Sequence, residues 1–296
     1  MSFKHKRVGR LLCFALAALL LFLGGCKLRQ EETIDPHVGE VCVSNGMGGE
    51  MWVPLYKELP VSTLKAEDFY VEGEYVNYSG EEYIAKRGVD VSEHQKNIDW
   101  AAVKADGVEF AIIRAGYRGC SEGLLNEDDY FRKNIEGALS QGIEVGIYFF
   151  SQALNSEEAL EEALYVLDLI EGYDVTLPIF YDWELVTNIG ETRCDNLTGA
   201  EVTDNALTFC AAIERHGHTA GIYFYRALGY REYELGRLGD YVFWAAAPGV
   251  TPDFYYEHSI WQYSFTARIN GIEGDTDLDL MFVKKPADTE EALTAG

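Results

Sequence analysis

The chain has 296 residues, of which 48% are hydrophobic and 25% are charged. This much apolar material is enough for a substantial core and excludes wholesale disorder. The formal net charge is −25, so nucleic acids and anionic membrane surfaces, which would repel the chain, are not expected partners. We attribute most of the acidic excess to solubility.

The first 25 residues have the pattern of a secretory signal peptide. Four basic residues precede an apolar run at residues 11–23, which is short of the roughly 20 residues that span a bilayer. The ending Leu-Gly-Gly-Cys resembles a bacterial lipobox, which predicts that residues 1–25 are removed and that Cys26 becomes a lipidated N-terminus. An uncleaved anchor helix is the alternative. Removal of the leader leaves 20 basic and 49 acidic residues, a net charge near −29.

The remaining cysteines do not form a metal-binding pattern. Cys42, Cys120, Cys194 and Cys210 are far apart, and the sequence contains no CxxC or HExxH. We therefore expect no metal site and no cofactor. Outside the cell, one or two disulfides are possible, with three connectivities that the sequence does not distinguish.

The sequence pattern changes near residue 86, from an irregular polar segment to alternating strand and helix patterns. Residues 26–85 are predicted to form a tether and a small extension, in which FYVEGEYVNY favours a hairpin about Glu72-Gly73. Residues 86–283 are predicted to form the main domain, and residues 284–296 a C-terminal tail.

Strand and helix patterns alternate through the main domain. Amphipathic helices are expected in DDYFRKNIEGALSQG, after Ser156, and after Thr198, which has capping-box spacing to Glu201. The expected strands are RGVDV, EFAIIRA, IEVGIYFF, VTLPIFYDW, TAGIYFY, YVFWAAA, SIWQY and TDLDLMF. About eight strands with helices between the earlier ones predict an α/β fold, an irregular TIM-like (β/α) barrel with mainly parallel strands. An open doubly wound sheet is the alternative, but no GxGxxG follows a strand.

The segment PIFYDWE places two carboxylates directly after an apolar run. Strand side chains alternate, so Asp182 and Glu184 should project together while Tyr181 and Trp183 point the other way. Their Cβ atoms would lie roughly 6.6 Å apart, a separation suited to acid/base chemistry on a bond between them. The alternative without a catalytic role is a solvent-exposed strand end that carries two surface acids.

Other polar and aromatic residues fall at the ends of predicted strands, where barrel enzymes carry their chemistry. They are Asp90, Arg114, Tyr117, Tyr148, Tyr223, Tyr225, Trp244, Gln262, Tyr263, Asp275, Asp277 and Asp279. Individually, Asp90 could cap a turn, Arg114 could form a structural ion pair, and Tyr148 and Trp244 could fill the core. Together, clustered acids and aromatic rings without a metal set or phosphate loop favour a carbohydrate site.

Five ordered blocks of the chain resemble glycoside hydrolase family 25, the lysozyme-like muramidases. They are RGVDVSEHQ, FAIIRAGY, DDYFRKNIEGA, PIFYDWE and IWQYSFTARINGIEGDTDLD, and together they cover about residues 87–282. The resemblance implies a monomeric, extracytoplasmic hydrolase that cleaves the β-1,4 bond after N-acetylmuramic acid in peptidoglycan glycan strands and contacts the membrane only through its lipid. It implies Glu184 as general acid/base, Asp182 as supporting carboxylate, and Asp90 and Asp277 as further acids of the active site.

Expected substrate-binding residues are Arg114, Tyr117, Tyr148, Tyr225, Trp244, Gln262 and Tyr263. The chain departs from the family pattern at His94, where a Trp is usual, and at Phe149 and Phe150, near which a His is usual. Two alternatives to the muramidase stay open. One is a chitinase-type or endo-N-acetylglucosaminidase barrel, which also ends a strand with Asp-x-Glu but has further acids before it. The other is a wall-binding lipoprotein without catalysis.

Overall fold

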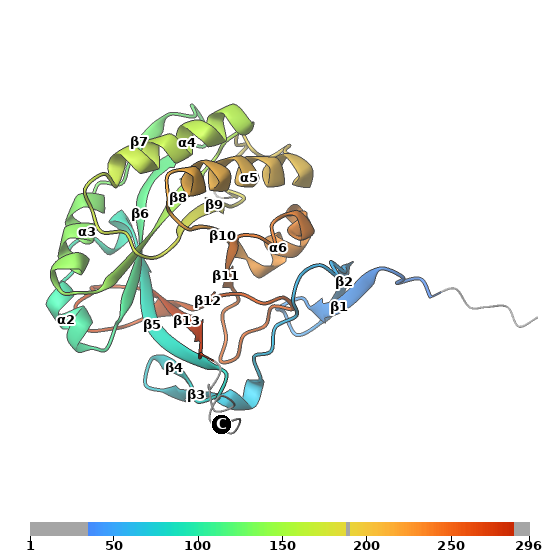
Figure 1. Ribbon diagram of the computed structural model, residues 1–296, viewed down its shortest axis with the longest axis horizontal. Coiled ribbons are helices and arrows are strands. Elements are labelled where there is room, and N and C mark those ends of the chain that lie inside the picture. Colours follow the sequence, from blue (N-terminus) through green and yellow to red (C-terminus); the bar gives the residue numbers. More distant parts are fainter. Residues whose placement is uncertain (1–34, 188–189, 287–296) are drawn as a thin grey trace, which may run out of the picture. The chain divides into compact units, whose positions relative to one another are not determined.

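The computed structural model describes residues 35–187 and 190–286. The chain divides into two compact units, Met1–Val38 and Gly39–Gly296, and the second contains the elements below. Its centre is a nine-stranded sheet, eight strands of which close into a barrel (Figure 1). These strands are β5 (Tyr83–Val91), β6 (Phe110–Arg118), β8 (Glu144–Ser151), β9 (Ile179–Trp183), β10 (Ala220–Tyr225), β11 (Val242–Ala246), β12 (Ile260–Ala267) and β13 (Thr276–Lys284), while β7 (Leu125–Glu127) extends the sheet from β6.

The strand pairing makes the barrel irregular. The order around it is β5-β13-β12-β11-β10-β9-β8-β6, and pairing of β5 with β6 closes the ring. Neighbours from β5 through β6, β8, β9, β10 and β11 to β12 are parallel. Among the eight barrel strands, β13 alone pairs antiparallel, with both β12 and β5. The predicted irregular barrel with mainly parallel strands is confirmed.

The helices begin where the capping residues allow. The described ones are α2 (Trp100–Ala105), α3 (Phe131–Ser140), α4 (Ser156–Leu169), α5 (Gly199–Arg215) and α6 (Arg226–Glu232), with 3-10 turns η1 (Ala66–Asp68), η2 (Glu93–Gln95) and η3 (Leu235–Arg237). The capping box expected of Thr198 and Glu201 opens α5. Helix α4 differs from expectation, because Asn155 and not Ser156 is the N-cap; its Oδ1 accepts the backbone N–H of Glu158 at 3.0 Å.

Alternation along the strands separates two buried layers. A cluster of inward-facing side chains fills the barrel: Phe110, Ile112, Phe180, Tyr223, Trp244, Ala246, Ile260 and Met281. The intervening side chains face outward and meet the helices, as where Tyr181 packs on Phe209 of α5 with ring centroids 5.5 Å apart. Phe180 and Asp182 therefore share the inner face of β9, while Tyr181 and Trp183 take the outer face.

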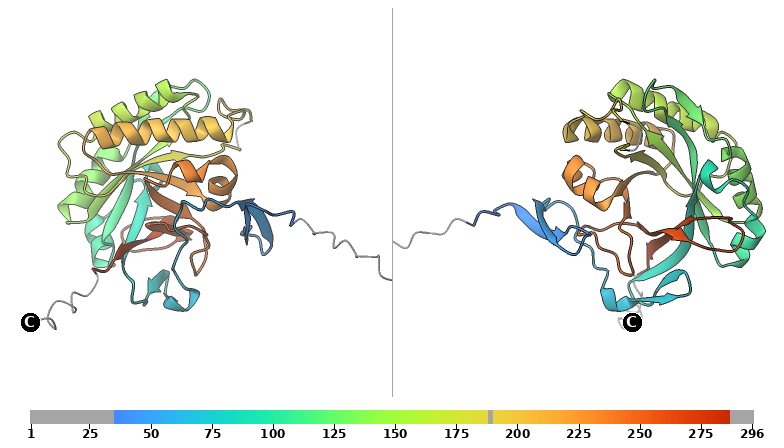
Figure 2. Two further views of the ribbon diagram at one scale, coloured as in Figure 1. Left: turned by 45° about the vertical axis from the view of Figure 1, so that its right-hand side comes forward. Right: turned by 180° about the vertical axis from the view of Figure 1, so that it is seen from behind.

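Two hairpins precede the barrel. Strands β1 (Glu40–Ser44) and β2 (Glu50–Pro54) form the first, and β3 (Phe69–Glu72) and β4 (Tyr75–Tyr78) form the second. The second confirms the predicted hairpin, with Gly73 at φ 63° in its turn. Helices α3 to α6 pack against strands β6 to β11, whereas β4 packs against β5 and β13 (Figures 1 and 2).

Aromatic side chains attach the β3–β4 hairpin to the barrel wall. The ring of Phe69 lies edge-on to Trp261 of β12 and to Phe282 of β13, with centroid distances of 5.5 and 6.0 Å. Tyr78 packs on the same Phe282 at 5.8 Å. Residues of the predicted extension thus cover strands on the side of the barrel where helical patterns fade from the sequence.

Two further observations concern the described residues alone. None of their helices is long and apolar enough to cross a bilayer, and the predicted leader with Cys26 lies outside the described residues. Cys42, Cys120, Cys194 and Cys210 all carry free thiols. No disulfide therefore crosslinks this part of the chain.

Candidate active site

A pocket of about 390 Å³ opens at the end of the barrel where the parallel strands terminate. Its lining combines charged, amide and aromatic side chains from all eight barrel strands and from the segment that follows β9. The lining residues are Asp90, Arg114, Tyr148, Phe150, Asp182, Glu184, Tyr223, Tyr225, Trp244, Gln262, Phe265 and Asp277. This is the end at which barrel enzymes carry their active sites.

Four of the lining residues are carboxylates, and all four were expected from the sequence. Asp182 and Glu184 come from the end of β9 and reach the pocket together, as the alternation of strand side chains requires. Asp90 ends β5, and Asp277 lies directly opposite it at the start of β13. Because β13 runs against the other strands, its first residues belong to the same rim as their last ones.

Hydrogen bonds hold the floor of the pocket in place. The amide nitrogen of Gln262 donates to Asp90 Oδ2 at 2.6 Å, and the Gln262 oxygen accepts from the hydroxyl of Tyr223 at 2.9 Å. The indole nitrogen of Trp244 donates to Oδ1 of the fully buried Asp279 at 2.8 Å. These bonds fix the planes of the aromatic rings and the direction of the Asp90 carboxylate.

Burial raises the pKa values of the carboxyl groups. The pKa of Asp182 is well above its ordinary value, because burial disfavours its charge and because Glu184 and Asp90 repel it. Burial also raises the pKa of Glu184. The pKa of Asp90 is raised by burial and by the charge of Asp279, and that of Asp277 rises to about 9. At neutral pH Asp277 therefore retains its proton, and Asp182 and Glu184 titrate as a pair.

Asp182 has an unused hydrogen-bond acceptor. Its Oδ1 atom is buried and has no partner among the described residues, although the side chain is only 4% exposed. A buried carboxylate oxygen without a donor is costly unless a bound molecule supplies one. The pocket therefore offers an acceptor at its centre for an N–H or O–H group of a ligand.

Arg114 is the cation that lines the pocket. Its Nε atom lies 2.7 Å from Asp128 and its Nη2 atom lies 3.0 Å from Glu93, so two acids outside the pocket orient the guanidinium. Its charge lowers the pKa of Tyr148 and of Asp182, against the larger effect of burial. Arg114 therefore forms structural ion pairs and also lines the pocket.

Two expected residues do not reach the pocket. Tyr263 follows Gln262 in β12 and faces the other way, packing on Trp261 with ring centroids 5.4 Å apart. Tyr117 lies beyond an irregularity in the pairing of β6 with β8 and contacts Arg114 from outside, with 5.3 Å between guanidinium carbon and ring centroid. Of the family departures, Phe150 lines the pocket, whereas His94 is exposed and lies outside its lining.

Four residues in or beneath the pocket were not assigned a role from the sequence. Phe150 and Phe265 line the pocket without having been singled out for binding, and Tyr223 was noted at a strand end without a role. Asp279 lies beneath the pocket, with burial raising its pKa to about 8. The sequence TDLDLMF shows that Asp277 and Asp279 share one face of a strand. It does not show that Asp279 lies deeper in the barrel, because that depends on the direction of β13.

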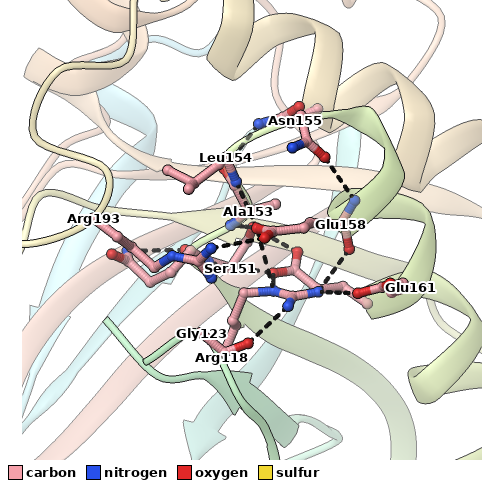
Figure 3. A network of polar contacts seen from close by, with 12 residues as sticks. Arg118, Gly123, Ser151, Ala153, Leu154, Asn155, Glu158, Glu161 and Arg193 are labelled. Carbon is pink, nitrogen blue, oxygen red and sulfur yellow. Dashed lines mark hydrogen bonds and ion pairs between the residues drawn. The ribbon is translucent and has the colours of Figure 1, made fainter. Parts of the chain in front are cut away.

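A polar network joins Arg118 of β6 and Ser151 of β8 to residues of α4 (Figure 3). The side-chain nitrogen of Gln152 donates to the carbonyls of Ser151 and Glu184, at 2.9 and 3.2 Å. Glu162 of α4 accepts from the hydroxyl of Ser151 at 2.6 Å and from Arg118 Nε at 2.8 Å. The backbone of Glu184 is therefore tied to β8 and, through it, to a buried ion pair.

The described residues contain no cluster of side chains suited to bind a metal ion. Among residues 35–187 and 190–286, no group of three or more His, Cys, Asp or Glu side chains has the arrangement to hold an ion. Among the acids of the pocket, Asp90 accepts a hydrogen bond from Gln262, and the charges of Glu184 and Asp90 raise the pKa of Asp182. Two carboxylates, a bound proton and aromatic walls are the equipment of acid/base cleavage of a glycosidic bond.

Comparison with known proteins agrees with this chemistry. The family profile described as "Glycosyl hydrolases family 25" matches residues 89–272. The chain is 26% identical over 194 residues to the autolytic lysozyme of Clostridium acetobutylicum, covering 65% of this chain and 55% of that protein. It is 29% identical over 202 residues to lysozyme M1 of Streptomyces globisporus, covering 64% of this chain and 66% of that protein.

A solved structure has the same fold. It is that of the modular autolysin LytC from Streptococcus pneumoniae in complex with a synthetic peptidoglycan ligand, with a TM-score of 0.59 and 22% identity over 70% of this chain and 53% of that one. This chain spans about half to two thirds of the length of the two lysozymes. Since the family profile covers more than half of its residues, the chain belongs to glycosyl hydrolases family 25.

Proposed function

We propose that this protein is an N-acetylmuramidase that hydrolyses the β-1,4 bond between N-acetylmuramic acid and N-acetylglucosamine in peptidoglycan. One observation carries the proposal: Asp182 and Glu184 project together into one pocket where burial raises the pKa of both. The substrate follows from family membership and from the names of the similar proteins, which are lysozymes and an autolysin.

Glu184 is assigned as the general acid and base. It is the more exposed member of the pair, so it can reach a glycosidic oxygen that enters from solvent. Burial raises its pKa, which favours the protonated form needed to protonate the leaving oxygen. After the bond breaks, the same carboxylate accepts a proton from the attacking water.

Asp182 is assigned to the substrate's 2-acetamido group. Its unpartnered Oδ1 atom is suited to accept the acetamide N–H and to hold the carbonyl oxygen against the anomeric carbon. The acetamide then acts as the internal nucleophile, and the Asp182 charge stabilises the oxazolinium-like intermediate. Water opens that intermediate with net retention. An inverted product, detected by NMR early in the reaction, would contradict this step.

The remaining residues are assigned to binding and charge. Asp90 and Asp277 oppose each other across β5 and β13, and burial raises the pKa of both, so each can donate a hydrogen bond when protonated and can stabilise the developing oxocarbenium ion when ionised. Trp244, Tyr148 and Tyr225 offer ring faces to sugars. We also propose roles in binding for Arg114 and Gln262. Tyr117 acts through Arg114, and Tyr263 supports β12 from the opposite face.

We propose further that the protein is a monomeric lipoprotein outside the cytoplasmic membrane. The basic and apolar pattern of residues 1–25 and the Leu-Gly-Gly-Cys ending support cleavage before Cys26 and lipidation of that residue. On this proposal residues 26–85 carry the tether and the extension, residues 86–283 the barrel, and residues 284–296 a tail. Cell fractionation tests it, because deletion of residues 1–26 should move the protein out of the membrane fraction.

The decisive experiment identifies the bond that is cut. A soluble form starting at residue 27 is incubated with purified peptidoglycan, and new reducing ends are identified by mass spectrometry beside the Glu184→Gln variant. Reducing-end N-acetylmuramic acid that disappears in the variant is the expected result. Reducing-end N-acetylglucosamine would make the enzyme a glucosaminidase. Binding to the wall without new reducing ends would make it a wall-binding lipoprotein.

A further inference from the structure

Two aromatic rings form the mouth of the pocket on one side. Phe265 is 38% exposed, which is unusual for a pocket-lining aromatic in this molecule, since Trp244 is 1% and Tyr223 is 7% exposed. The ring of Phe265 lies beside that of Tyr225, with centroids 6.5 Å apart and planes at 40°. Both rings line the same pocket as the carboxylates.

Phe265 reaches this place through a break in strand alternation. Gln262 and Phe265 both line the pocket, although residues an odd number apart in a regular strand face opposite sides. The pairing of β12 with β13 shifts register between Gln262 and Ser264 and again between Ser264 and Ala267. Such bulges redirect side chains at barrel rims. The irregular backbone therefore turns Phe265 toward the pocket.

Phe265 differs from the other aromatic residues of the β10–β12 side of the pocket, which are Tyr223, Tyr225 and Trp244. The deep rings of Tyr223 and Trp244 are held by hydrogen bonds to Gln262 and Asp279. Phe265 has no polar group to bond with, so its exposed ring offers a ligand only an apolar face.

We propose that Tyr225 and Phe265 form an aromatic subsite for a pyranose ring that neighbours the one held at Asp182 and Glu184. A pyranose has a C–H face that packs on an aromatic ring, and its hydroxyls stay in water at an open rim. This subsite rests on the proposed muramidase activity and specifies its substrate further. It makes the enzyme favour extended glycan strands over the shortest fragments that it can cleave.

Steady-state kinetics with two substrates tests the subsite. We compare Phe265→Ala, Phe265→Trp and the control Leu124→Ala, an equally apolar change at a residue that is 65% exposed and outside the pocket lining. With long soluble glycan strands, Phe265→Ala should raise KM roughly three- to tenfold at unchanged kcat. With the shortest cleavable fragment it should have no effect. Phe265→Trp and Leu124→Ala should behave like the original protein.

Other outcomes overturn the subsite. They are an unchanged KM in Phe265→Ala, an equal rise with both substrates, an equal rise in Leu124→Ala, or a tryptophan variant as weak as the alanine variant. Binding of the strands to Glu184→Gln with and without Phe265→Ala, measured by calorimetry, keeps the two hypotheses apart. If Phe265→Ala weakens this binding, the subsite is supported even when the reducing-end assay gives no N-acetylmuramic acid. If the affinity is unchanged, the subsite is wrong even when the muramidase activity is found.

Discussion

Asp277 at the start of β13 lies directly opposite Asp90 at the end of β5. This pairing exists because, among the barrel strands, β13 alone runs antiparallel to its neighbours, so that its first residues join the rim formed by the last residues of the other strands. The charge of Asp90 raises the pKa of Asp277. Like charges placed opposite each other destabilise a sheet, so this pair costs stability wherever both acids are ionised.

The first prediction concerns the pH profile of kcat/KM. On the proposed mechanism the active form carries one proton on the pair, on Glu184, so activity should fall on both sides of a maximum as that proton is lost or a second is gained. Asp182→Asn removes the partner charge, so the acid limb should vanish and the alkaline limb should move to lower pH, with kcat lower by roughly 100-fold. If the alkaline limb did not move, the charge of Asp182 would not influence the pKa of Glu184, and the prediction would be wrong.

The second prediction concerns stability and Asp279. Burial raises its pKa to about 8, so between the ordinary carboxyl range and pH 8 the folded state binds more protons than the unfolded state. Its contribution to stability is therefore greatest at low pH and is lost as pH rises through about 8. Asp279→Asn keeps the acceptor for Trp244 and should flatten this decline. Urea unfolding of both proteins at pH 5 and pH 9 measures it; parallel declines would contradict the assignment.

The third prediction concerns the β3–β4 hairpin. Phe69→Ala removes the ring that packs on Trp261 and Phe282 and should lower the free energy of unfolding by about 2–3 kcal/mol. Tyr70→Ala is the matched control, because the neighbouring ring in the same strand is 51% exposed and its loss should cost little. Urea unfolding compares them. Equal effects would mean that the hairpin does not support the barrel.

The fourth prediction concerns the buried ion pair of Arg118 and Glu162 (Figure 3). Arg118→Met leaves Glu162 buried without its partner and should cost about 3–5 kcal/mol. The cost should be larger at pH 8 than at pH 5, since burial places the pKa of Glu162 at about 7 even with the arginine present. Denaturant titrations at the two pH values provide the measurement.

A surface arginine supplies the control for this fourth prediction. Arg237 pairs with Asp204 and Glu234, and its side chain is 43% exposed. Its replacement by Met should cost less than about 1 kcal/mol. The double variant Arg118→Met/Glu162→Gln should recover part of the loss, because it removes the unpaired charge. If both single arginine variants lost the same stability, burial would not be the cause.

The barrel was predictable because its strands are short apolar runs that end in polar residues. The eight predicted strands correspond to β5, β6 and β8 to β13, and alternation in PIFYDWE places Asp182 and Glu184 on one face. The antiparallel direction of β13 was not predictable. No helix pattern separates β12 from β13, but a short connection alone does not distinguish a hairpin from a tight crossover.

The misplaced and missed residues have local causes. Gln262 and Tyr263 are adjacent in one strand, so only one could face the pocket, and the sequence does not say which. Phe265 escaped notice because its orientation comes from a register shift that depends on the partner strand. Tyr117 likewise follows an irregularity between Arg114 and Gly116. Alternation predicts side-chain direction only while the ladder is regular.

The reversed β13 also decides how the barrel joins the rest of its chain. Barrel closure makes the first and last strands neighbours, and the reversal of β13 sets Tyr83 opposite Lys284 at the end of the strands away from Asp90 and Asp277. The polypeptide therefore enters and leaves the barrel at nearly one point, remote from the pocket. In a domain with this geometry, another protein can be fused at either end of the barrel without obstructing the approach of substrate to the pocket. The barrel can also be inserted into a loop of a host protein, because its two ends lie close together.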